Sequence, residues 1–344
     1  MKKRTVAKNL LILFMIILFA YLCFSDNGLI EFIKNPSKLN LWWLLVGVLC
    51  QIMQITLDGI LTYKFLHNIN SKITFKNSFA CALLGQFYCA ITPSATGGQP
   101  MQVYFMSKRK VDAGTTTSAL TQKFLIYQIT LIIYFIFTII YKTEYLKSVN
   151  PAVYLILSFG FVLQVTCLVI LIIFSVNKTI TSKIIIHVFN FLSKIKIVKN
   201  PKEKIDKLKQ NIQLFNLGNK YLYNKKVVLQ AIALTLFQLT FMFFIPFCVY
   251  KSFGFSGHKP LDMICAQSFI VMSSSLFPIP GASGAAEGAS SIFLSPYFGE
   301  ESIKSAIVVI RLVMYYFTII LTAPFAKITK IHDEDKESEY SPHE

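Results

Sequence analysis

The chain has 344 residues, of which 54% are hydrophobic and only 15% are charged, against about a quarter charged in ordinary soluble domains. The formal net charge is +17, yet several stretches of about 20 residues carry almost no charge, which is the length needed to cross a bilayer core. This composition excludes a large soluble domain and predicts an all-α membrane protein that crosses the bilayer several times.

Six apolar segments are predicted to cross the membrane. The first, at about 8–24, follows a basic start but lacks a small-x-small cleavage site, so we expect an uncleaved span rather than a signal peptide. The remaining five predicted spans lie at 41–66, 118–141, 151–175, 227–250 and 303–325.

Two further apolar stretches, 78–106 and 262–298, are interrupted by residues that stop helices. Lysines flank the first stretch on both sides, so by the positive-inside rule it enters from the cytoplasm and returns there. The second stretch follows a span that leaves a Lys-rich loop, so it enters from the outside. The sequence therefore predicts two re-entrant broken-helix hairpins of opposite orientation, with both termini in the cytoplasm.

The two interruptions share the pattern P-x-A-[T/S]-G. The pattern begins at Pro93 and again at Pro280, 187 residues later, and a basic residue follows each start inside an apolar span. That residue is Lys123 in the first half, 30 residues on, and Arg311 in the second half, 31 residues on. Matching breaks of opposite orientation are typical of an inverted repeat, whose discontinuous helices place a substrate site near the bilayer midplane.

The residue types at the breaks suit an anionic ligand. Glycines allow close approach of the backbone, N–H groups at a half-helix start attract a phosphate, and hydroxyl groups add donors. Small residues also serve tight helix packing, but two matching breaks favour a substrate site. The predicted binding residues at the breaks are Pro93, Thr96, Gly97, Gly98, Gln99, Pro280, Gly281, Ser283 and Gly284.

Charged residues inside the spans extend this predicted site, because a charge at the bilayer centre costs at least ~2.5–3.5 kcal/mol. Arg311 is one of three arginines among 34 basic residues, and its planar fork suits phosphate or carboxylate. Glu287 is either its counter-charge, a proton carrier or half of a structural ion pair. Lys123 either joins the site or extends to the cytoplasmic surface. Asp58 is a further candidate, with a polar position near the interface as the alternative.

Residues 177–226 are predicted to form a basic cytoplasmic connector, with twelve lysines against two acidic residues. Anionic lipid headgroups and the positive-inside rule account for this charge, so no nucleic acid is expected as a partner. From Pro201 onward an apolar stripe opposes a basic one, which predicts an amphipathic helix on the inner membrane surface. The stripe consists of Ile205, Leu208, Ile212 and Phe215. The tail 326–344 is acidic and expected to be disordered.

The seven cysteines all fall inside apolar segments, without a CxxC pair or a histidine cluster. This pattern favours buried small hydrophobic side chains over a zinc site or a disulfide framework. We therefore expect no metal and no other cofactor.

The first break, from Thr92 to Pro100, is similar to the membrane region of the bacterial lysylphosphatidylglycerol synthase/flippase family, as are Lys108-Arg109 and Thr121-Gln122-Lys123 after it. The second break, 280–288, resembles that family's distal Pro-Gly-rich motif, which ends in a glutamate. The resemblance implies one flippase-like domain over 1–325 in a bacterial plasma membrane. It also implies a protein that binds and translocates an anionic or aminoacylated phospholipid, which in the family confers resistance to cationic peptides.

Full-length members of that family also carry a cytosolic aminoacyltransferase domain that uses charged tRNA. This chain ends shortly after its last predicted span, so we expect the membrane module alone. Besides lipid translocation, two alternatives stay open. One is a phosphatidylglycerol lysyltransferase component that needs a separate aminoacyltransferase subunit, and the other is an ion-coupled transporter of a small anionic solute. The expected partners are an anionic phospholipid and the membrane, and a homo-oligomer stays open.

Overall fold

The computed structural model describes residues 39–148, 151–194, 201–219, 222, 224–275, 277, 280–282 and 284–326, which form helices and turns without a strand. Five of its helical segments are long and apolar enough to cross a membrane. They are α3 (Leu41–Ile69), α6 (Ala113–Tyr141), α8 (Pro151–Val176), α11 (Lys225–Ser252) and the segment Ala285–Ala326. The prediction of an all-α polytopic protein is therefore confirmed. The predicted span at 8–24 and the tail beyond 326 lie outside the described residues.

The first interrupted stretch is a hairpin of two short helices. α4 (Phe75–Ile91) ends just before a short 3-10 turn, η2 (Pro93–Ala95). α5 (Gly98–Ser107) then packs back against α4. With 17 and 10 residues, neither arm reaches across ~30 Å of hydrocarbon at 1.5 Å per residue. This stretch is therefore a re-entrant hairpin, as predicted.

The second interrupted stretch repeats this plan and runs on into the last span. α12 (Pro260–Ser274) is followed by the 3-10 turn η4 (Pro280–Ala282) and by α13 (Ala285–Arg311). Helical geometry within α13 is broken at Gly299, where φ is 70° and ψ is 165°, so the returning arm ends there. The last span follows and includes one π-helical turn, η5 (Leu312–Tyr316).

The backbone itself repeats at the two hairpin tips. Ser94 and Ala95 have φ values of 48° and 54°, and the matching residues Gly281 and Ala282 have values of 60° and 49°. Positive φ is uncommon outside glycine and costs free energy. Its occurrence at two matched pairs of positions shows that the sequence repeat is also a structural repeat.

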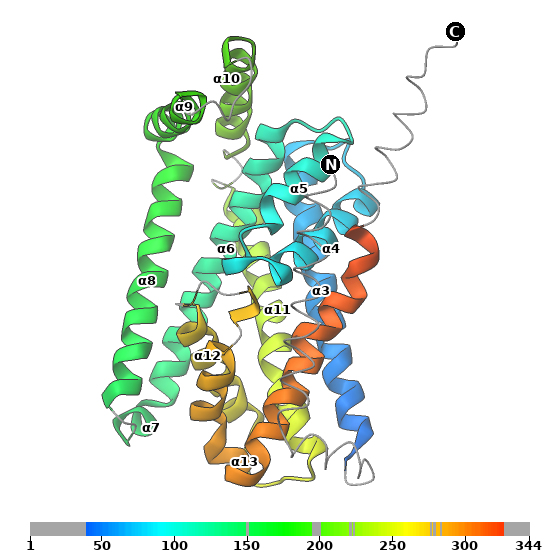
Figure 1. The fold of residues 1–344 in the computed structure, drawn as a ribbon, viewed down its shortest axis with the longest axis vertical. Coiled ribbons are helices and arrows are strands. Elements are labelled where there is room, and N and C mark those ends of the chain that lie inside the picture. The colour runs from blue at the N-terminus through cyan, green and yellow to red at the C-terminus, as the bar shows by residue number, and fades with distance from the viewer. Residues whose placement is uncertain are drawn as a thin grey trace.

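The two halves run in opposite directions through the bundle. The backbone N–H of Asn40 donates to the carbonyl of Ser252 over 2.8 Å, which joins the start of α3 to the end of α11. Near the other end, Lys64 Nζ donates to Gln230 Oε1 over 2.6 Å. α3 and α11 are therefore antiparallel, and their hairpins enter from opposite ends of the bundle (Figure 1). The tips η2 and η4 contact each other, as an inverted repeat requires.

In the connector, the apolar stripe that was predicted to face the membrane is buried inside the protein. The stripe of α10 (Pro201–Gly218) packs against α6 rather than on the membrane, with Ile212 and Phe215 only 6% and 8% exposed. Gly114 permits this contact, because a Cβ there would lie 2.1 Å from the carbonyl oxygen of Asn211. The preceding helix, α9 (Lys178–Lys194), instead exposes the apolar residues Ile180, Ile184, Val188 and Phe191.

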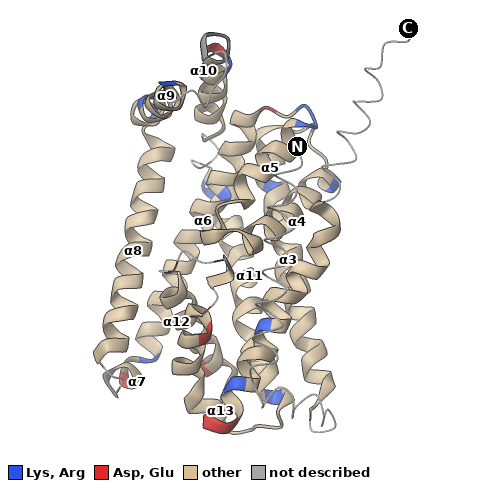
Figure 2. Ribbon diagram, in the orientation of Figure 1, with Lys and Arg blue, Asp and Glu red and all other residues tan. Residues whose placement is uncertain are grey.

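The sides of the bundle are apolar. Charged residues gather at its two ends and are sparse along the spans (Figure 2), which is the distribution expected when the sides face lipid. α8, reached from α6 through the short helix α7 (Thr143–Ser148), exposes large side chains such as Leu155 and Phe159. It joins the bundle by a close backbone contact with α12 at Gly160.

Replacing Gly160 by Ala should lower the melting temperature of the purified protein by several degrees. The new Cβ would lie 2.6 Å from the carbonyl oxygen of Met272, and such overpacking costs about 1–3 kcal/mol. Gly288→Ala is the matched control, because a Cβ there meets nothing within 4 Å and alanine favours the helix. Equal melting temperatures for the two variants would contradict the packing described for α8.

Candidate functional site

A cavity of about 330 Å³ lies inside the bundle beside the tip of the first hairpin. Its walls come from α3, α4, α5, α6 and α11, so it is formed by both halves of the repeat. The apolar part of the lining includes Leu61, Leu120, Phe124 and Met242. Its polar side chains are Gln54, Asp58, Gln86, Gln99, Gln102, Lys123, Tyr127, Thr235 and Gln238.

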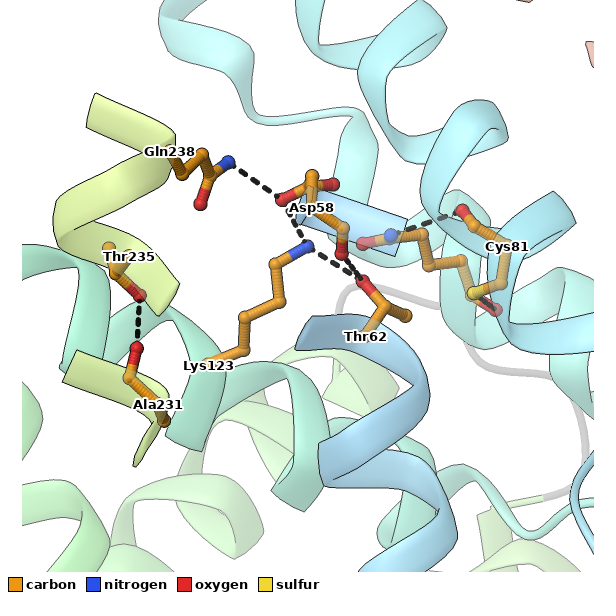
Figure 3. A network of polar contacts seen from close by, with 8 residues as sticks. Asp58, Thr62, Cys81, Lys123, Ala231, Thr235 and Gln238 are labelled. Atoms are coloured by element: carbon orange, nitrogen blue, oxygen red, sulfur yellow. Dashed lines mark hydrogen bonds and ion pairs between the residues drawn. The ribbon is translucent and has the colours of Figure 1, made fainter. Parts of the chain in front are cut away.

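An ion pair between two spans lies at the wall of this cavity. Lys123 Nζ is 2.6 Å from Asp58 Oδ1 and also donates to the hydroxyl of Thr62 over 2.8 Å. Gln238 Nε2, on α11, donates to the same carboxylate oxygen over 3.4 Å (Figure 3). The side chains of Asp58 and Lys123 are only 8% and 17% exposed. Both charges are therefore buried, paired and in contact with the cavity.

The ion pair lies far from both ends of the spans that carry it. Asp58 is eleven residues before the end of α3, or roughly 16 Å at 1.5 Å per residue. Lys123 is ten residues after the start of α6, or roughly 15 Å from that end. The middle residues of these two 29-residue helices are 55 and 127, so Asp58 and Lys123 each lie about one turn from the middle of a span. Lys123 thus reaches a buried partner instead of the protein surface, and Asp58 is buried between α3, α6 and α11.

The cation of the second half has a different partner. Arg311 Nε lies 2.9 Å from Glu287 Oε1, and Arg311 Nη1 donates to the carbonyl of Gly281 over 2.9 Å. The second carboxylate oxygen of Glu287 accepts a hydrogen bond of 2.6 Å from the backbone N–H of Gly284. Arg311 and Glu287 therefore pair directly and satisfy backbone groups that the helix break leaves open. Neither residue lines the cavity beside the first tip.

The first tip is closed by hydroxyl groups. The Thr92 hydroxyl donates to the carbonyl of Tyr88 over 2.6 Å and accepts the backbone N–H of Gly97 over 2.9 Å. The Thr96 hydroxyl donates to the carbonyl of Pro93 over 2.8 Å. These groups stabilise the turn in which they lie, and Thr96, Gly97 and Pro93 do not line the cavity.

Two predicted glycines have a packing role in this structure. A Cβ at Gly98 would lie 2.2 Å from the sulfur of Cys89, and one at Gly281 would lie 2.4 Å from the ring of Tyr315. The hydroxyl of Tyr315 donates to the carbonyl of Ala90 over 2.8 Å, which ties the last span to α4. Ser283 and the side chain of Pro280 lie outside the described residues, and Gly284 has a φ of 83°.

The cavity thus brings together three of the predicted residues, Asp58, Lys123 and Gln99. Its wall also contains four glutamines that were not among the predicted residues, namely Gln54, Gln86, Gln102 and Gln238. Their signal was a polar amide within an apolar helix, which is costly in lipid unless it faces protein or a wet cavity. No group of three or more His, Cys, Asp or Glu that could hold a metal occurs among the described residues.

The fold and the cavity define a polytopic helical membrane protein built as an inverted repeat of broken helices. The chain belongs to the family "Lysylphosphatidylglycerol synthase TM region", whose model matches residues 6–322. It is also similar to a UPF0104 membrane protein of Methanocaldococcus jannaschii, with 27% identity over 339 residues that cover 93% of this chain and 95% of that protein.

Asp58→Asn should destabilise the protein by about 3–5 kcal/mol, because Lys123 would keep its charge without a counter-charge in a buried setting. A second change, Lys123→Gln, should restore most of the lost stability, since the double variant leaves neither charge behind. Unfolding of the two single variants and the double variant measures this coupling. Additive losses would show that the two side chains do not interact.

Glu287→Gln should lower the melting temperature by several degrees. Glutamine keeps an oxygen for the backbone N–H of Gly284 but removes the counter-charge of Arg311. Glu301→Gln, at an exposed position of the same helix, is the control and should leave the melting temperature unchanged. Lipid binding by the folded Glu287→Gln variant then separates the two predicted roles of the pair. Unchanged binding indicates a structural pair, and altered binding indicates contact with the ligand.

Proposed function

We propose that this protein binds an anionic or aminoacylated phospholipid of the lysylphosphatidylglycerol type in the cavity and moves its headgroup across the bilayer. The observation that carries this proposal is the cavity between the spans with one cation and one anion in its wall. Lys123 matches the phosphate of such a headgroup, and Asp58 matches an ammonium group of an aminoacyl ester. Membership of the family supports the same class of lipid.

The size of the cavity supports a headgroup rather than a whole lipid. About 330 Å³ lies near the lower end of the range for small-molecule pockets, so it accommodates a headgroup but not two acyl chains. The acyl chains stay in the bilayer beside the bundle while the polar group passes through the protein. Polar side chains in the cavity wall lower the cost of this passage, because a headgroup in hydrocarbon alone would leave its polar groups unpaired.

The two hairpin tips are the parts of the fold that suit alternating access. They enter from opposite ends, contact each other at η2 and η4, and are closed by separate sets of hydrogen bonds. Rocking of one half against the other around such a contact is the usual way in which inverted repeats open a central site to each side. We propose a bacterial plasma membrane as the location, in line with the family resemblance, and cytoplasmic termini, in line with the charges that flank the spans.

The double variant Asp58→Asn/Lys123→Gln tests this proposal without leaving an unpaired charge. Its affinity for phosphatidylglycerol in nanodiscs should fall at least about tenfold, the effect of losing a charge-assisted hydrogen bond of ~1.5 kcal/mol. Movement of fluorescent phosphatidylglycerol between the leaflets of proteoliposomes should fall with it. The matched control is Asp206→Asn/Lys209→Gln, which neutralises an exposed ion pair on α10.

Wild-type rates of lipid movement in a folded Asp58→Asn/Lys123→Gln variant would contradict the proposal. Soluble glycerol phosphate separates lipid from solute transport. If it competes with the lipid as strongly as a second lipid does, and is itself carried into liposomes, the protein transports a small anionic solute instead.

A further inference from the structure

The cavity contains an unusual concentration of side-chain amides. Gln54, Gln86, Gln99, Gln102 and Gln238 line it and come from α3, α4, α5 and α11. Asp58 and Lys123 are the only charged residues of the lining, and they neutralise each other. The wall therefore has no net charge, and most of its polar atoms are neutral donors and acceptors.

Part of this hydrogen-bonding capacity is already used inside the protein. Gln102 Nε2 donates to the carbonyl of Cys81 over 3.1 Å, and Gln238 Nε2 donates to Asp58. Gln54 Oε1 accepts a bond of 3.4 Å from Gln51. Each bond engages one end of an amide that carries two donors and an acceptor. The opposite ends, namely Gln102 Oε1, Gln238 Oε1 and Gln54 Nε2, are not engaged by these bonds.

Gln86 and Gln99 differ from the other three amides, because no hydrogen bond of their side chains occurs among the described residues. Gln86 is half-buried on α4 and Gln99 is exposed at the start of α5, so they lie on the two arms of the first hairpin. Both line the cavity on the side of the first tip. A ligand can therefore engage both ends of these two amides, whereas each of the other three has one end held within the protein.

We infer that the cavity selects headgroups by their hydroxyl groups, so that its preferred ligands are polyol phosphates such as glycerol or a cyclitol carried on phosphate. This inference rests on the proposed function and specifies what the site recognises. A hydroxyl is one donor and a double acceptor, which matches the mixed ends of amides. A charge-neutral wall gives little preference for one anion over another, whereas amides without a partner penalise a headgroup that lacks hydroxyls.

The test compares anionic lipids that differ in their hydroxyl groups. Phosphatidylglycerol, phosphatidylinositol and phosphatidic acid are competed against one fluorescent lipid on the full chain in nanodiscs. We expect phosphatidylglycerol and phosphatidylinositol to bind at least tenfold more tightly than phosphatidic acid. In Gln86→Leu/Gln99→Leu this ratio should fall to about twofold or less, mainly because phosphatidylglycerol and phosphatidylinositol bind more weakly. Gln213→Leu, an exposed glutamine on α10, is the control and should keep the full ratio.

The outcomes distinguish hydroxyl selection from lipid binding itself. Equal binding of phosphatidic acid and phosphatidylglycerol by the wild type overturns hydroxyl selection but leaves lipid binding in place. An unchanged ratio in a folded Gln86→Leu/Gln99→Leu variant overturns it as well. Failure of all three lipids to bind overturns the proposed function and this inference together. Loss of phosphatidic acid binding in the glutamine variant would show that these amides shape the cavity rather than select the headgroup.

Discussion

Every helix break inside a membrane leaves backbone N–H and C=O groups that lipid cannot satisfy, and this constraint governs the arrangement of the described bundle. At the first tip the Thr92 hydroxyl bridges the broken ends, and at the second tip the Glu287 carboxylate and the Arg311 guanidinium do so. The two tips also cover each other, because η2 and η4 are in contact. These hydrogen bonds and the contact between the tips thus satisfy part of the polar groups of both breaks within the protein.

The two halves neutralise their buried cations with different carboxylates, and only the cation of the first half borders the cavity. Arg311 is neutralised within its own hairpin by Glu287, so its charge and the tip form one closed unit. Lys123 is neutralised by Asp58 from another span, α3. The counter-charge of Lys123 therefore lies outside the first hairpin. The cavity and its glutamines lie between the tip of this hairpin and the ion pair.

The antiparallel pairing of α3 and α11 determines how the two hairpins are placed relative to each other. Because the two long helices run in opposite directions, the hairpins that follow them meet tip to tip inside the bundle. The two hairpins approach from opposite ends of the bundle. A buried cation follows each hairpin, Lys123 after the first and Arg311 after the second. In the described structure the cation of the first half, Lys123, borders a cavity, and that of the second half, Arg311, does not.

The sequence by itself determined the helical membrane class, five spans that the structure confirms, the two broken hairpins and their repeat. These features follow from local signals: apolar length, helix-stopping residues and the sidedness of lysines. Local signals also marked Lys123 and Asp58 as costly charges, but their pairing joins α6 to α3 and depends on how distant helices pack. The place of the glutamines in the cavity wall could not be predicted from local signals either, since it depends on which residues of other helices face each amide. Which glycines serve packing, and which stripe of the connector is buried, were likewise set by tertiary contacts such as Gly98 with Cys89 and α10 with α6.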